Sequence, residues 1–136
     1  MNDSKRMWEL MVHGSDELAD ELGLEEPPAV FAPARALGAV DAWLAANQEP
    51  LDEDDTARLG MFLARVLIET HGGGITQIAE PGHPLEGEWA VSGFQGGLDP
   101  EYHVPFVVSA VRIGMDRELK AAEWYAQTIK EGRARR

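Results

Sequence analysis

The chain contains no cysteine among its 136 residues. Disulfides, thiolate nucleophiles, iron–sulfur clusters and thiolate zinc sites are therefore excluded, and the composition suits a reducing compartment. Long apolar runs are also missing, since each covers only a few residues whereas a membrane span needs about 20. No signal peptide is recognisable at the N-terminus, so we expect a soluble, cytoplasmic protein.

Positive charge is scarce as well. The sequence holds 12 Lys and Arg against 24 Asp and Glu, which gives a net charge of −12. Sequence-independent binding to DNA or RNA is disfavoured, because it depends on neutralising phosphates with Lys and Arg. Residues 1–60 hold 14 acids and 4 bases, whereas residues 61–136 hold 10 acids and 8 bases. The acidity is therefore concentrated in the N-terminal part of the chain.

The chain length and a hydrophobic content of 44% predict one folded domain with an apolar core. Within that domain we distinguish an N-terminal helical segment (1–50), a helix–sheet–helix core (51–132) and a basic tail (133–136). The tail favours a solvated helix end, where cations suit the negative pole of the helix dipole.

Two short helices are predicted at the N-terminus, the first ending at Gly14 and the second running from a Ser15 cap to Gly23. Glu25–Pro28 contains two prolines and predicts a connector. A third helix is expected to begin near Pro33 and to end around 47–50, since its apolar residues recur at spacings of three and four.

The clearest helix begins after Asp52, where four consecutive acids suit the positive pole of a helix dipole. Its apolar residues recur with the period of a helix and predict one wide buried stripe formed by Leu59, Phe62, Leu63, Val66 and Leu67. The string His71-Gly72-Gly73-Gly74 follows, and it predicts a glycine that ends the helix in a left-handed conformation.

The pattern then changes to short β-type segments at 75–79, 88–94 and 102–104. We expect a small antiparallel sheet of about three strands. Residues 104–114 fit either a helix or a strand, and Pro105 favours the helix because it would remove a hydrogen-bond donor from a strand. Asp116 is expected to cap a last helix that reaches about Gly132. This order of elements predicts an α+β fold.

Three patterns invite a catalytic or metal-binding interpretation. The His-Gly-Gly-Gly string also occurs where lipases form an oxyanion hole, but none of the four serines has the required nucleophile elbow. A metal site would need histidines to gather with glutamates, although their spacing matches no ligand motif; the candidates are His71, His83, His103, Glu80, Glu86 and Glu88. Glu88, beside Trp89, is the carboxylate that we consider for acid–base chemistry. The alternative is that Glu88 simply occupies an outward-facing position of a strand. We assign no catalytic residue, metal ligand or cofactor.

A binding loop is predicted around the glycine turns that follow the second β segment. In this interpretation an aromatic side chain projects from the tip of the loop, where binding residues often lie. The residues concerned are Phe94, Gln95, Tyr102 and His103. Packing of the aromatic rings into the core is the alternative.

Residues 55–116 resemble a family of small bacterial domains without an assigned function. The matching features are Leu59-Gly60, the stop at Gly72-Gly73, Trp89 in a hairpin and Pro105-Phe106 leading into a helix. The tryptophan lies farther from the glycine stop than in the family pattern. The resemblance covers less than half of the chain, and it implies a fold but no catalytic residues.

The sequence therefore favours a non-enzymatic, acidic domain that binds a basic protein, because opposite charges accelerate encounter. An immunity protein that blocks a toxin is one concrete form of this hypothesis. Two alternatives remain open: a small hydrolase using His71 or His103, and a small-ligand pocket between the sheet and the 53–71 helix.

Overall fold

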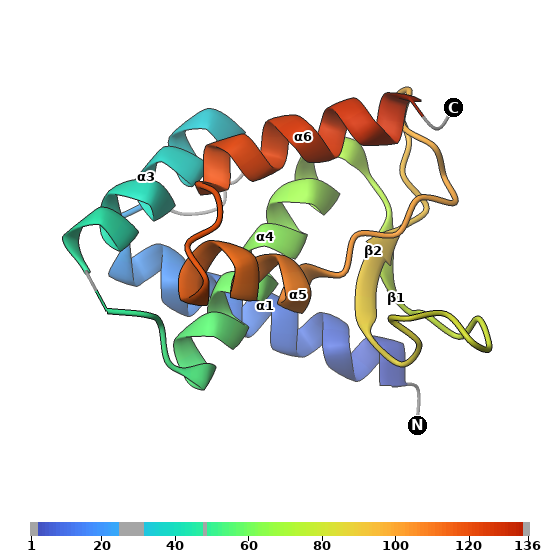
Figure 1. Ribbon diagram of the computed structural model, residues 1–136, viewed down its shortest axis with the longest axis horizontal. Coiled ribbons are helices and arrows are strands. Elements are labelled where there is room, and N and C mark those ends of the chain that lie inside the picture. Colours follow the sequence, from blue (N-terminus) through green and yellow to red (C-terminus); the bar gives the residue numbers. More distant parts are fainter. Residues whose placement is uncertain (1–2, 25–31, 48, 135–136) are drawn as a thin grey trace.

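The computed structural model describes residues 3–24, 32–47 and 49–134. Helix α4 runs through the middle of the molecule, with α1 and α6 on either side and a β-hairpin at one end (Figure 1). The α+β class is confirmed. In chain order the elements are α1 (Asp3–Glu21), α3 (Pro33–Ala46), α4 (Glu53–His71), β1 (Gly74–Gln77), β2 (Trp89–Ser92), α5 (Phe106–Ala110), the π-helical turn η1 (Val111–Met115) and α6 (Ala121–Ala134).

Helix α4 has the predicted boundaries. The Asp52 carboxylate accepts a hydrogen bond from the backbone N–H of Asp55 at 2.8 Å, which satisfies one of the free donors of the first turn. At the other end Gly72 takes a φ of 74° and donates its N–H to the Ile68 carbonyl. The apolar stripe lies fully in the core, as predicted.

Helix α1 is one continuous helix of 19 residues, so the predicted break at Gly14 is wrong. A Cβ atom on Gly14 would lie 3.3 Å from Cγ of Met61, so the glycine allows α1 to approach α4 closely. Ser15 does not cap a second helix, because its hydroxyl donates to the Val12 carbonyl within α1. Packing against α4 therefore outweighs the intrinsic cost of a glycine inside a helix, about 1 kcal/mol.

The end of α1 and the whole of α3 follow the predictions. Gly23 has a φ of 73°, and Leu24 donates its N–H to the Ala19 carbonyl, as in a Schellman motif. Helix α3 begins at Pro33 and is followed by Asn47 in extended conformation. The predicted connector at Glu25–Pro28 lies outside the described residues.

The sheet has two strands in the described residues, not about three. Strands β1 and β2 pair antiparallel, with Gly74 opposite Ser92 and Gln77 opposite Trp89. The predicted third strand is reduced to a single bridge, in which Val91 and Val104 exchange two hydrogen bonds of 2.9 Å. Pro105 follows with no N–H to extend the ladder, and the chain enters α5 at the next residue.

Residues 106–115 are helical, which confirms the favoured interpretation of this segment, and the last five form a π-helical turn. Helix α5 packs closely on α4 because Gly60 has no side chain. A Cβ atom there would lie 3.2 Å from the Phe106 carbonyl oxygen.

Helix α6 begins at Ala121, and the predicted cap from Asp116 is wrong. The cap comes from α3 instead: the Asp41 carboxylate accepts hydrogen bonds from the N–H groups of Ala121 (2.6 Å) and Ala122 (3.2 Å). Glu123 adds a second contact by accepting from the N–H of Lys120 at 3.1 Å. The segment before α6 has no regular structure, so Asp116 is too far from the helix start to serve it.

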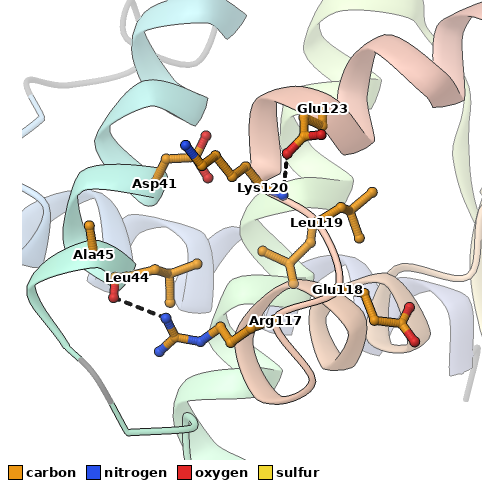
Figure 2. Close-up of a pocket in the computed structure, with 9 residues that line it drawn as sticks. Asp41, Leu44, Ala45, Arg117, Glu118, Leu119, Lys120 and Glu123 are labelled. Carbon is orange, nitrogen blue, oxygen red and sulfur yellow. Dashed lines mark hydrogen bonds between the residues drawn. The ribbon is translucent and has the colours of Figure 1, made fainter.

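Arg117 joins this segment to the end of α3. Its side chain donates to four backbone carbonyls at 2.8–3.0 Å, and Figure 2 shows the bond to Leu44. Its φ of 53° is the only positive value at a non-glycine residue in the described part of the chain. The four acceptors are Gly114, Leu44, Asn47 and Glu49.

One core unites the N-terminal helices with the rest of the chain. Met11, Leu18 and Leu37 are buried in the same cluster as the α4 stripe and Phe106. The predicted basic tail starts within α6, which includes Arg133, while Arg135 and Arg136 lie outside the described residues. Among the described helices, none combines the length and the apolar character that crossing a bilayer requires.

Candidate functional site

The end of α1 lies beside the start of α4. The Arg58 guanidinium on α4 contacts the Glu21 carboxylate on α1 at 2.7 Å, and Arg65 contacts Asp16 one to two turns back along α1. In Figure 1 both helix ends lie on the side away from the hairpin. Two acidic segments that are about thirty residues apart in the sequence therefore meet at one end of the molecule.

A shallow, open groove of about 540 Å³ lies at this junction. Among the described residues that line it, carboxylates dominate and one guanidinium is present. The lining residues are Glu17, Asp52, Asp54, Asp55, Ala57 and Arg58. We refer to this surface as the acidic groove.

The single cation of the acidic groove is already paired. Arg58 donates to both Asp55 and Glu21. The hydrogen bond to Asp55, followed by the interaction with Glu21, raises the pKa of Arg58 against the lowering effect of burial. Asp54 and Glu17 are exposed beside it. Negative charge in the groove is therefore only partly compensated from within the protein.

The surroundings extend the negative potential. Segments 16–21 and 52–55 carry eight carboxylates. In the described part of the chain the bases that contact them are Arg58, Arg65 and the exposed His13, which lies 3.5 Å from Glu17. The acids of 52–55 lie at the positive pole of α4, where they are stabilising. Asp20 and Glu21 lie at the negative pole of α1, which bears no base in its last turn. A surface of this kind attracts cations and basic proteins.

The predicted binding loop divides into a buried part and an exposed part. Phe94 does not project from a loop tip, because only 2% of its surface is exposed and its ring packs 6.2 Å from that of Tyr102. Its apolar ring is buried instead with the core of α4 and β2. Tyr102 is half-buried and donates to Glu131, whereas Gln95 and His103 are exposed. A binding role for these three residues stays a prediction.

The His-Gly-Gly-Gly string ends α4, as predicted. His71 turns its ring toward α6, where Nε2 lies 2.7 Å from the Tyr125 hydroxyl. The Gly72 N–H is occupied by Ile68, and the Gln95 N–H donates to the His71 carbonyl at 2.8 Å. The hydroxyls of Ser15, Ser92 and Ser109 all have other hydrogen-bond partners. The arrangement is that of a structural helix end.

Partial burial of His71 makes stability depend on pH. Burial, with a smaller contribution from the positive charge of Arg133, lowers the pKa of His71 below its usual 6.5. Between that lowered pKa and 6.5 the unfolded chain binds a proton that the folded chain does not. The contribution of His71 to stability is therefore complete above pH 6.5 and is lost as the pH falls through the folded-state pKa.

We expect the free energy of unfolding to fall between pH 7.5 and pH 5.5, and to fall less in His71→Gln. Urea denaturation at several pH values measures this difference. His13→Gln is the matched control, since the side chain of His13 is 78% exposed. If the free energy of unfolding depended on pH equally in wild type and His71→Gln, the lowered pKa of His71 would not be the cause of the pH dependence.

The histidines and glutamates considered as candidate metal ligands do not gather. Within the described parts of the chain, no three or more His, Asp or Glu side chains are arranged to hold a metal ion. His83 instead accepts a hydrogen bond from the Leu85 N–H at 3.0 Å in the β1–β2 connection. Glu88 is half-buried directly before β2, where its backbone pairs with Ile78.

Both acidic runs are visible in the sequence, but their meeting is not, because it depends on the direction in which α1 packs on α4.

Comparison with known proteins adds no relative: no family model, curated protein or solved structure matches the chain. The resemblance of residues 55–116 to a bacterial domain family stays a prediction.

Proposed function

We propose that this protein is a non-enzymatic interaction domain that binds a basic protein through the acidic groove. One observation carries the proposal: the packing of α1 on α4 gathers two acidic segments around one open groove. Complementary charge across an interface accelerates association and selects the partner. The immunity-like form of this function, in which the partner is a toxin, stays a prediction.

The groove suits lysine and arginine side chains better than an apolar partner. Asp52, Asp54 and Asp55 present their carboxylates within one turn of α4, and Glu17 faces them from α1. Carboxylates with free lone pairs accept hydrogen bonds from ammonium and guanidinium groups. The interaction is expected to weaken at high salt, because exposed charges are screened over about 10 Å at 0.1 M ionic strength.

The proposal is tested by affinity capture from a lysate of the native host, with three versions of the protein. The groove variant is Glu17→Gln with Asp54→Asn, which leaves the Asp52 cap intact. The control variant is Glu80→Gln with Glu101→Gln, since both residues are exposed outside the groove and the net charge changes by the same amount. Captured proteins are eluted by a salt step and quantified.

We expect to capture a basic partner in stoichiometric amount and to release it by salt. The control variant should bind this partner as wild type does. The groove variant should bind it about 5- to 30-fold more weakly, which corresponds to a loss of about 1–2 kcal/mol of binding free energy for two exposed charges. A partner bound equally by both variants would place the interface elsewhere. An empty capture, or a partner that resists salt, would contradict charge-driven binding.

A further inference from the structure

A second hollow, of about 330 Å³, lies between α3, the segment before α6 and the first turn of α6. Its apolar wall is formed by Leu44 and Ile113, which are buried, and by the half-buried Leu119. Charged side chains surround this wall. Figure 2 shows Asp41 on α3, Glu123 in the first turn of α6 and the other charged residues on the segment that leads into α6. The volume is at the lower end of the range for small-molecule sites, about 300–1,000 Å³. We call it the α3–α6 pocket.

Two of the charged side chains at the pocket are already bonded to other groups of the protein. The Arg117 side chain donates to one carbonyl in η1 and to three carbonyls at the end of α3 and just beyond it. Glu118 is paired with Arg112 at 2.9 Å. The remaining charges are the carboxylates of Asp41 and Glu123 and the ammonium of Lys120. The free charge at the pocket is therefore predominantly negative.

The start of α6 is closed to anions. Asp41 accepts from two of its N–H groups, and Glu123 accepts from the Lys120 N–H directly before it. A carboxylate offers about four lone-pair sites, so both side chains retain sites for a further donor. A ligand that donates hydrogen bonds and carries positive charge fits these groups, whereas a carboxylate or phosphate would face two negative side chains.

We propose that the α3–α6 pocket binds an aliphatic ammonium group. The alkyl chain packs on Leu44, Ile113 and Leu119, and the ammonium donates to the carboxylates of Asp41 and Glu123. Lys120 competes for the same position: it is exposed, and in Figure 2 its side chain extends from the residue before α6 toward Asp41 on α3. Binding requires this side chain to turn out into solvent.

The ammonium has two sources, a free alkylamine or a lysine side chain of a partner protein. The α3–α6 pocket shares no lining residue with the acidic groove, so the inference is independent of the proposed function. Three probes of equal length, hexylammonium, hexanol and hexanoate, separate the effect of charge from that of the apolar chain. Nα-acetyl-lysine amide, which keeps its side-chain ammonium, represents a protein-borne source.

Two variants test the geometry by amide chemical-shift titration of the labelled protein. Glu123→Gln removes a charge and keeps the backbone contact, because glutamine serves the same cap as glutamate. Lys120→Gln removes the competing cation. Glu101→Gln is the control, since it changes the charge of an exposed residue outside the pocket. The amide spectrum of each variant verifies that it is folded.

We expect saturable shifts with hexylammonium at Leu44, Ile113 and Leu119, weaker shifts with hexanol and none with hexanoate. The dissociation constant should rise about two- to fivefold in Glu123→Gln, fall by a similar factor in Lys120→Gln and stay unchanged in Glu101→Gln. Tighter binding of the lysine amide than of hexylammonium would assign the site to a partner's side chain, and the reverse to a free amine. Binding of hexanoate as tightly as hexylammonium, an unchanged constant in Glu123→Gln, or no saturable shift with either amine would overturn the proposal.

Discussion

Replacing Gly73 by alanine is expected to lower the free energy of unfolding by about 2–5 kcal/mol. Gly73 has a φ of 98°, where an L-residue is strained by about 1–2 kcal/mol. A Cβ atom there would also lie 2.5 Å from the Ser92 carbonyl oxygen, which is backbone and has no rotamer to change. Relief requires a shift of the hairpin against the end of α4, and overpacking of this kind costs about 1–3 kcal/mol.

Gly82→Ala separates the two contributions. Gly82 has a similar φ of 81°, but nothing lies within 4 Å of its Cβ position. It is therefore expected to lose only the strain energy, about 1–2 kcal/mol. Urea denaturation of both variants measures the difference. If both variants lost the same free energy of unfolding, the contact of the added Cβ with the Ser92 carbonyl would cost nothing.

Replacing Arg117 by alanine is expected to lower the free energy of unfolding by about 2–3 kcal/mol. A hydrogen bond from a charged donor contributes about 1.5–3 kcal/mol. The total stays well below four times this value, because the four bonds share one side chain that is open to water. Alanine would also keep the positive φ of this position, so the backbone strain persists. Loss of the side chain leaves carbonyls of Asn47 and Glu49 without this donor. The end of α3 should loosen from the segment before α6.

Two further variants sharpen this test. Arg117→Lys should recover little, since an ammonium cannot reproduce the planar fork that reaches carbonyls on both sides. Arg112→Ala removes an exposed ion pair with Glu118 and should cost less than about 1 kcal/mol. Thermal unfolding and amide hydrogen exchange at residues 44–49 measure the effects. Full stability in Arg117→Lys would show that charge alone, without the fork geometry, holds the segment.

Local signals were sufficient where an element is defined by its own residues. Helix α4 has a capping carboxylate, a continuous apolar stripe and a glycine stop within one stretch of sequence, and all three appear in the structure. Gly14 shows the limit of such signals, because a glycine that would end an isolated helix remains helical where Met61 of another helix packs on it. The same applies to the third strand, since Val104 has strand character but only one bridge before Pro105.

The acidic groove was partly foreseeable. The concentration of acids in residues 1–60 indicated a charged surface, and it motivated the expectation of a basic partner. The sequence left open whether Phe94 projects from the loop or packs in the core, because local sequence does not distinguish the two; the structure shows that it is buried. The α3–α6 pocket left no recognisable signal, since Asp41 and Glu123 are about eighty residues apart.

The sequence by itself determined the absence of thiol chemistry, the strong negative charge, the α+β class and the limits of α3 and α4, because composition and short-range periodicity are properties of neighbouring residues. Only the tertiary structure decided that Asp41 caps α6, that Arg117 fastens the end of α3, and that the acidic ends of α1 and α4 meet. Each of these depends on which helix packs against which. That choice is made by burial of the whole apolar core, to which distant residues contribute jointly.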